Sequence, residues 1–147
     1  MVTTPEFETI TATLDGRLGH LTLNQPSRLN PLGSTALAEL AVAARWFDGT
    51  PAAVVVVSGV GRAFSAGFDR RELGGEVPPI TDAAGTPVSA AVLGANMAAA
   101  VSSMQAMTLA AVRGPCVGGG FVLALCCDLR VAADYAWFSL PETELGI

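Results

Sequence analysis

Two glycine-containing segments carry residue types and spacings that suit the binding of an anionic oxygen. Gly118, Gly119 and Gly120 stand directly before the apolar run FVLALCC, and a second glycine lies in FSAGFD. Glycine costs about 1 kcal/mol relative to alanine inside a helix, so a triplet indicates a special backbone role. Because a helix N-terminus leaves N–H groups unpaired, the Gly119 N–H is placed to hold a developing negative charge.

FSAGFD predicts a second donor, the N–H of Phe68, because this loop also follows an apolar strand and opens a helix. Two converging N–H groups form an oxyanion hole, in which removal of one donor typically costs about 2.7–4 kcal/mol. Glu142, in the pair Pro141-Glu142, supplies the acid/base group nearby. By itself, the glycine triplet fits tight helix–strand packing equally well.

Other catalytic constellations are poorly represented. The triplet has neither the GxGxxG spacing of a dinucleotide site nor the GK[ST] of a phosphate loop. A serine hydrolase would need Ser65 with His20, but no GxSxG frames the serine, and a packed or surface histidine is expected at position 20. With one histidine and no suitably spaced acidic cluster, no metal site is expected.

The first half of the chain alternates strand and helix patterns around these loops. Residues 7–24 predict a hairpin that turns at Asp15-Gly16, and residues 25–33 form a proline-containing loop. Ser34 is expected to cap a helix that runs to about Asp48. The run AAVVVVSG then predicts a strand buried on both faces of a parallel sheet.

The second half repeats the alternation. A loop leads to a short helix around residues 69–73, and the Gly- and Pro-rich residues 74–88 predict a mobile surface segment. A helix over 89–107, a strand over 109–114, a helix from the glycines to about 127 and a strand over 129–134 follow. The fold class is therefore α/β, as one domain over residues 1–147.

The composition and net charge indicate which classes of binding partner to expect. Hydrophobic residues make up 51% and charged residues 14%, which indicates extensive burial, part of it between subunits. The net charge is −5 without a basic cluster, so nucleic acid is an unexpected partner, and Arg70-Arg71 fits a solvated helix face better than a phosphate clamp. No apolar run is long enough to cross a membrane, and no signal pattern precedes the domain, so we expect a soluble protein.

Three cysteines lie in apolar surroundings without CxxC spacing. Cys116, Cys126 and Cys127 are expected to be buried reduced thiols, which favours the cytoplasm.

In combination the motifs are specific. GRAFSAGFDRREL, followed by VRGPCVGGGFVLALCCDLRVAADYAWFSLPETELGI, resembles the enoyl-CoA hydratase/isomerase (crotonase) family, and LTLNQPSRLNPLG resembles that family's LNRPxxxNAL segment. The resemblance implies a crotonase/ClpP-like spiral of ββα units, an acyl-CoA substrate with no further cofactor, and homotrimers or hexamers. It places the oxyanion donors at Phe68 and Gly119. It places coenzyme A contacts at Ala66 and at the backbone of Ser27, Arg28 and Leu29.

Two departures from the family pattern affect the expected reaction. Hydratases of the family carry a first glutamate three residues after the oxyanion glycine, where this chain has Val122. Valine cannot transfer a proton, so the remaining Glu142 favours a single-glutamate isomerase over a hydratase. Glu144 would share the side of Glu142 if the segment were extended, although a solvent-exposed charge is the commoner outcome.

The family also continues beyond the PExxxGI segment with C-terminal helices, which are absent here. The sequence is expected to be a truncated gene product, a proteolysed core or a subunit that needs a partner chain. Two functions follow: proton transfer on an enolate in fatty-acid metabolism, as a lyase or isomerase, or inactive acyl-CoA binding.

Overall fold

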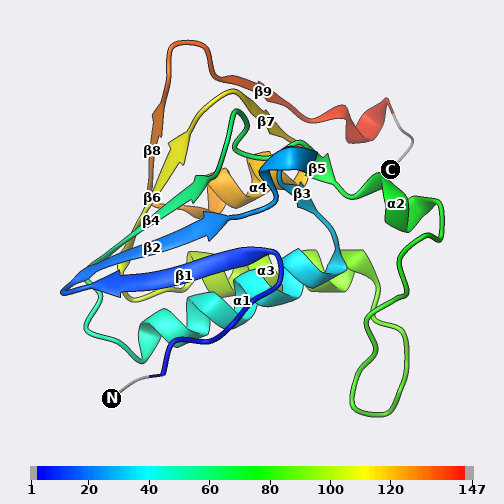
Figure 1. Cartoon of the computed structure of the whole chain (residues 1–147), viewed down its shortest axis with the longest axis horizontal. Helices are drawn as coiled ribbons and strands as arrows, with labels where there is room; N and C mark the ends of the chain where they lie inside the picture. The colour runs from blue at the N-terminus through cyan, green and yellow to red at the C-terminus, as the bar shows by residue number, and fades with distance from the viewer. Residues whose placement is uncertain (1–2, 145–147) are drawn as a thin grey trace.

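The computed structural model describes residues 3–144, in which a five-stranded sheet is covered on one face by two helices that lie side by side (Figure 1). The helices are α1 (Ser34–Asp48) and α3 (Ala90–Ser102). The strand order is β1-β2-β4-β6-β8, and all neighbours are parallel except β1 and β2. The strands are β1 (Ile10–Asp15), β2 (Leu18–Leu23), β4 (Val54–Gly59), β6 (Met107–Val112) and β8 (Leu129–Ala132).

Each strand of the parallel part is followed by a short strand outside the main sheet. The short strands are β3 (Pro31–Leu32), β5 (Gly67–Phe68), β7 (Pro115–Val117) and β9 (Trp137–Ser139). The smaller helices are α2 (Arg70–Leu73) and α4 (Gly119–Cys126), with 3-10 turns η1 (Pro26–Arg28) and η2 (Pro141–Thr143). The units β2–β3–α1, β4–β5–α2–α3 and β6–β7–α4 repeat along the chain. The predicted α/β class and spiral of ββα units are confirmed.

The hairpin follows from side-chain alternation. Ile10 and Ala12 are buried while Thr11 and Thr13 are exposed, as expected of a strand with one face on the core. The two strands pair antiparallel and end with Asp15 opposite Leu18, across a turn in which Gly16 has a φ of 58°.

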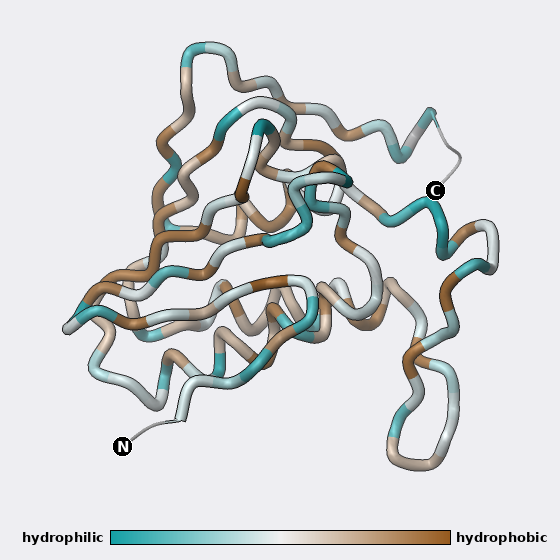
Figure 2. The backbone as a smooth tube through the Cα atoms, viewed as in Figure 1, coloured by the Kyte–Doolittle hydropathy of each residue, from teal (hydrophilic) through white to brown (hydrophobic). Residues whose placement is uncertain are grey.

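The valine run occupies the middle of the sheet, as predicted. Val55 and Val57 are fully buried against the helix side, where Leu40 and Phe47 of α1 belong to the same core cluster. The alternate valines are half-buried, so the second face is covered less completely than predicted. Figure 2 shows hydrophobic residues along the central strands and a hydrophilic stretch at α2.

Three local predictions need correction. Ser34 is the first residue of α1 and not its cap, because the N-cap is Gly33 and the carboxylate of Glu72 accepts the Ser34 N–H and hydroxyl. The third helix ends at Ser102 and not at position 107, because the Gln105 N–H turns back to the carboxylate of Asp48. The short strands β3, β5, β7 and β9 were not predicted, and β3 and β5 lie in segments that the sequence analysis assigned to loops.

One face of the molecule leaves large apolar side chains exposed. All four residues of β8 are exposed, and Trp137 and Leu140 on the following segment are about half exposed. We call the exposed apolar residues of β8, of β9 and of the position that follows β9 the β8–β9 face; its members are Leu129, Val131, Trp137, Phe138 and Leu140. Among the helices within residues 3–144, none has the length and apolar character needed to span a membrane.

Candidate active site

The segment that contains Phe68 is bonded along its length to the segment that precedes α1. β5 pairs with β3, so that Phe68 lies opposite Leu32. The Ala66 N–H donates to the Leu29 carbonyl at 2.8 Å, and the Ser65 hydroxyl donates to the Asn30 carbonyl at 2.7 Å. These bonds hold the two predicted ligand-binding loops together as one unit.

Asn30 organises the turn of this unit from a buried position. Its amide nitrogen donates to the carbonyls of Val60 and Ala63, and its side-chain oxygen accepts the Gln25 N–H. Its φ is 52°, and the φ of the preceding Leu29 is 62°, a left-handed backbone that asparagine tolerates better than most residues. The sequence analysis did not single out Asn30, although an asparagine that follows a proline turn is a usable signal.

The glycine triplet begins α4, as predicted, and two of its members are needed for close approach. Gly118 is the N-cap with a φ of 52°, and its N–H donates to the Ser139 carbonyl at 2.8 Å. A Cβ at Gly120 would lie 2.5 Å from the Cβ of Ser65, so only glycine lets α4 pack on the Phe68 segment. Gly119 is the first helical residue, where the N–H has no intrahelical acceptor.

Glu142 is brought to the start of α4 by the turn η2. A Cβ built on Gly118 would lie 2.6 Å from Glu142 Oε1 and 3.9 Å from the Cα of Gly67. The carboxylate, the N-cap of α4 and the β5 segment therefore meet at one place. Glu142 Oε2 is buried and has no hydrogen-bond partner within the described part of the chain.

The predicted coenzyme A contacts are grouped as the resemblance implied. Ser27, Arg28 and Leu29 belong to the turn η1 and its C-cap, and Ser27 is exposed. Ala66 is also exposed and is joined to this turn by its bond to Leu29. Contact with coenzyme A stays a prediction for all four residues.

Val122 and Glu144 do not supply a second catalytic carboxylate. Val122 lies in the first turn of α4, where its N–H donates to the Gly118 carbonyl and its side chain is 38% exposed. Glu144 follows a 3-10 turn and not an extended segment, so the alternation that would have placed it beside Glu142 does not apply. It is exposed, as in the commoner of the two expectations.

Asp69 is the most strongly bonded acid in this region. Its side chain is 7% exposed and accepts from Arg28 at 2.7 Å and from Arg71 at 3.2 Å, and it caps α2 through the Arg71 N–H. Burial acts to raise the pKa of this carboxyl, but the hydrogen bonds from the two arginines outweigh it and lower the pKa to about 2. These bonds give Asp69 a structural role at the start of α2.

The residues of the serine-hydrolase alternative are not arranged for that chemistry. The Ser65 hydroxyl donates to the Asn30 carbonyl and accepts the Gly67 N–H, so it is bound within the loop unit. His20 is exposed in β2, as expected. The thiols of Cys116 and Cys127 are buried, as expected, and desolvation raises the pKa of each to about 12, whereas Cys126 is only half-buried and corrects the expectation for that position.

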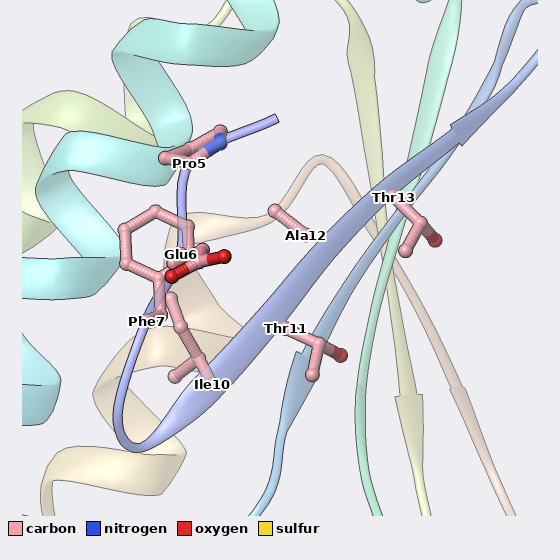
Figure 3. Close-up of a pocket in the computed structure, with 7 residues that line it drawn as sticks. All are labelled: Pro5, Glu6, Phe7, Ile10, Thr11, Ala12 and Thr13. Atoms are coloured by element: carbon pink, nitrogen blue, oxygen red, sulfur yellow. The ribbon is translucent and has the colours of Figure 1, made fainter. Parts of the chain in front are cut away.

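Two of the hollows on the surface of residues 3–144 are relevant to ligand binding. One, of about 530 Å³, is bounded by Phe68, α2, the 74–88 segment and the start of α3, and its lining is mostly apolar. The other, of about 380 Å³, is lined by residues 5–7 and 10–13, and Figure 3 shows Ile10 and Ala12 on one face of β1 and Thr11 and Thr13 on the other. Of these two hollows, the first adjoins the candidate site, because Phe68 lines it. Residues 3–144 hold no cluster of three or more metal-binding side chains.

Comparison with known proteins identifies the family. The model of the enoyl-CoA hydratase/isomerase family matches residues 14–147. The chain belongs to this family. A probable enoyl-CoA hydratase, echA8, of Mycobacterium bovis is 36% identical over 142 residues, which are 96% of this chain and 52% of that protein. The mevalonyl-coenzyme A hydratase sidH of Aspergillus fumigatus is 35% identical over 129 residues, 86% of this chain and 45% of that protein.

Solved structures of the enoyl-CoA hydratase/isomerase family share the fold. The enoyl-CoA hydratase subunit I of Geobacillus kaustophilus superposes with a TM-score of 0.80 at 36% identity, over 97% of this chain and 53% of that one. A family member from Hyphomonas neptunium has a TM-score of 0.82 at 28% identity, over 95% of this chain and 53% of that one. The crotonase fold is thereby confirmed, and the chain spans about half the length of the relatives that it matches.

Proposed function

We propose that this protein binds an acyl-CoA thioester and stabilises its enolate, with Phe68 and Gly119 N–H groups on the thioester oxygen and Glu142 as the proton carrier. The position of Glu142 is the main support for the proposal. Its carboxylate lies against Gly118, one residue from Gly119, and its buried Oε2 has no partner within residues 3–144. A buried carboxylate oxygen without a partner is costly, so its retention suggests a functional role.

The proposed reaction is a shift of a double bond. Glu142 removes a proton from the carbon next to the thioester carbonyl, and the electron pair moves onto the oxygen held by the two N–H groups. The same carboxyl then returns the proton two carbons further along, which leaves the acid ionised and the double bond conjugated with the carbonyl. Val122 at the place of the hydratases' first glutamate favours this isomerisation over the addition of water.

The surroundings of Phe68 suit the two ends of such a substrate. The turn Ser27–Leu29, in which Ser27 is exposed, and the exposed Ala66 would contact coenzyme A. The apolar hollow of about 530 Å³ on the other side of Phe68 would accommodate the acyl chain.

Exchange of the α-proton tests this function. The chain is incubated with a saturated acyl-CoA in deuterium oxide, and incorporation of deuterium is followed by mass spectrometry. Glu142→Gln should abolish exchange, because an amide cannot take the proton, and Glu144→Gln should leave it unchanged, because that carboxylate is exposed. Exchange that survives Glu142→Gln would contradict the assignment.

A second candidate is acyl-CoA binding without turnover. Val122 favours it, since valine cannot transfer the proton that the first glutamate of a hydratase handles. Calorimetry with an acyl-CoA, and with free coenzyme A beside it, separates the candidates. Saturable binding that prefers the thioester, without proton exchange, would support the binder, whereas binding with exchange would support the enzyme.

A further inference from the structure

Asp69 is covalently next to Phe68, and its carboxylate reaches the turn that would contact coenzyme A. Asp69 Oδ1 accepts from Arg28 Nη2 at 2.7 Å, across 41 positions of sequence. The other nitrogen of this guanidinium, Nη1, donates to the side chain of Gln25 at 3.0 Å. The Arg28 guanidinium thus makes two side-chain hydrogen bonds, and one of them is to Asp69, the residue after the proposed donor Phe68.

The bonding of Asp69 exceeds what a helix cap requires. A cap needs a single bond from the side chain to an N–H in the first turn, as Ser89 makes to Val92 at the start of α3. Asp69 makes the equivalent bond to the Arg71 N–H and, in addition, receives both Arg28 and the Arg71 guanidinium. Since α2 has only four residues, capping alone does not account for a buried carboxylate with two ion pairs.

The contacts on either side of Asp69 leave the Phe68 peptide little freedom. On one side Phe68 is opposite Leu32 in the pairing of β5 with β3. On the other, the Cβ of Asp69 is so close to Gly33 that a Cβ added there would lie 3.1 Å from it. The hydrogen bond from Arg28 to Asp69 adds a third contact, from the turn that would bind coenzyme A.

We propose that Asp69 is a positioning residue, which fixes the Phe68 N–H relative to the turn Pro26–Leu29, so that a thioester seated on the turn meets a donor already aligned. The proposal rests on the proposed function, in which Phe68 is an oxyanion donor. It assigns no proton transfer to Asp69. A displacement of about 1 Å at a reacting group can lower a rate about 100-fold, so alignment of this kind has a measurable effect.

The stretching frequency of the bound thioester carbonyl reports on donor alignment directly. We would measure it by infrared difference spectroscopy with a ¹³C-labelled acyl-CoA bound to the Glu142→Gln chain, in which turnover is blocked. Two aligned N–H donors lower the frequency relative to free acyl-CoA. Asp69→Asn in the same background should reduce this lowering while the dissociation constant of free coenzyme A stays nearly unchanged.

The matched control is Asp128→Asn. Asp128 is also a hydrogen-bonded carboxylate, which accepts the N–H and hydroxyl of Thr108 at 2.7 and 2.9 Å, but it lies at the junction of β6 and β8. Asp128→Asn should leave the stretching frequency of the thioester carbonyl unchanged. In the chain with Glu142 intact, Asp69→Asn should lower the rate of proton exchange at saturation about 10- to 100-fold, and Asp128→Asn should not.

The outcomes separate the two proposals. No lowering of the carbonyl frequency in the Glu142→Gln parent would overturn the proposed oxyanion site itself. A normal lowering in the parent that persists in folded Asp69→Asn would overturn the positioning role alone. If Asp69→Asn does not fold, Arg28→Gln carries the test, because it keeps the carboxylate and its bonds to Arg71. An unchanged frequency in that variant would equally overturn the role.

Discussion

At the scale of single residues, the backbone at Gly118 and the carboxylate of Glu142 depend on each other. Gly118 has a φ of 52°, in the left-handed region, and the space where a Cβ would stand is taken by Glu142 Oε1. The glycine therefore serves two purposes, because it turns the chain into α4 and admits the acid. The sequence alone does not show this dependence, because Gly118 and Glu142 are far apart in it.

Gly118→Ala is expected to reduce proton exchange far more than it reduces stability. The added Cβ would lie 2.6 Å from Glu142 Oε1, so the carboxylate would have to move away. The positive φ of position 118 would also strain an alanine, at a cost somewhat above about 1 kcal/mol. Deuterium incorporation and urea unfolding, measured side by side, check the prediction. Gly94→Ala is the control, since it lies within α3 with open space around it and should be neutral or slightly stabilising. Exchange at the parent rate in Gly118→Ala would contradict the geometry.

At the scale of elements, the ion pairs of Asp69 join the turn η1 to α2 and make their junction sensitive to acid. The folded-state pKa of Asp69 is about 2, below its ordinary value of 3.8. A carboxyl with a lowered pKa stabilises the fold fully above its unfolded-state value, and this contribution disappears as the pH falls through the folded-state value.

Between about pH 5 and pH 2, the wild-type chain should therefore lose about 2 kcal/mol of unfolding free energy that Asp69→Asn does not lose. Urea unfolding at a series of pH values, followed by circular dichroism, measures the difference. The two curves should converge toward low pH. Parallel curves over the whole range would show that the arginine pairs contribute nothing to folding.

The elements also show what sequence patterns can and cannot predict. The hairpin, the buried valine strand and the glycine start of α4 were predictable, because alternation, β-branched runs and turn residues act locally. β7 and β9 have three residues each, too few for a period, and their pairing of Cys116 with Phe138 is a tertiary event. After α3, the Gln105 N–H donates to the carboxylate of Asp48, the last residue of α1. No local sequence pattern could reveal this contact.

The candidate site was predictable to the same limited degree. Phe68, Gly119 and Glu142 were found through their motifs, and the structure brings their segments together. The contacts that hold these segments could not be predicted, because Asn30 and Asp69 bind residues 30 or more positions away. Motifs predict the groups that would meet a ligand, whereas the supporting contacts emerge only from the fold.

At the scale of the whole molecule, the β8–β9 face is the main departure from an ordinary protein surface. Leu129 and Val131 are exposed on the outermost strand of the main sheet, and Trp137 and Phe138 continue the apolar surface. Large exposed apolar patches and unpaired strand edges both promote association. The prediction that some burial takes place between chains fits this face.

The chain of 147 residues, studied alone, should therefore self-associate as its concentration rises. Val131→Lys should reduce the association, because a charge on an edge strand opposes strand addition. Sedimentation velocity at several concentrations measures it. Val92→Lys is the matched control, since that valine is similarly exposed but lies on α3 away from the face. Equal behaviour of the two variants would show that another surface drives association.

The order in which the site is assembled along the chain has a consequence for synthesis. Both proposed donors, at positions 68 and 119, precede the turn η2 that brings Glu142 against Gly118. During synthesis, the segments of the proposed donors Phe68 and Gly119 would thus be present before the proposed base, Glu142. Until η2 has formed, the nascent chain would hold the segments of both proposed donors without the proposed base, so the proposed proton transfer would be the last step of the site to become possible.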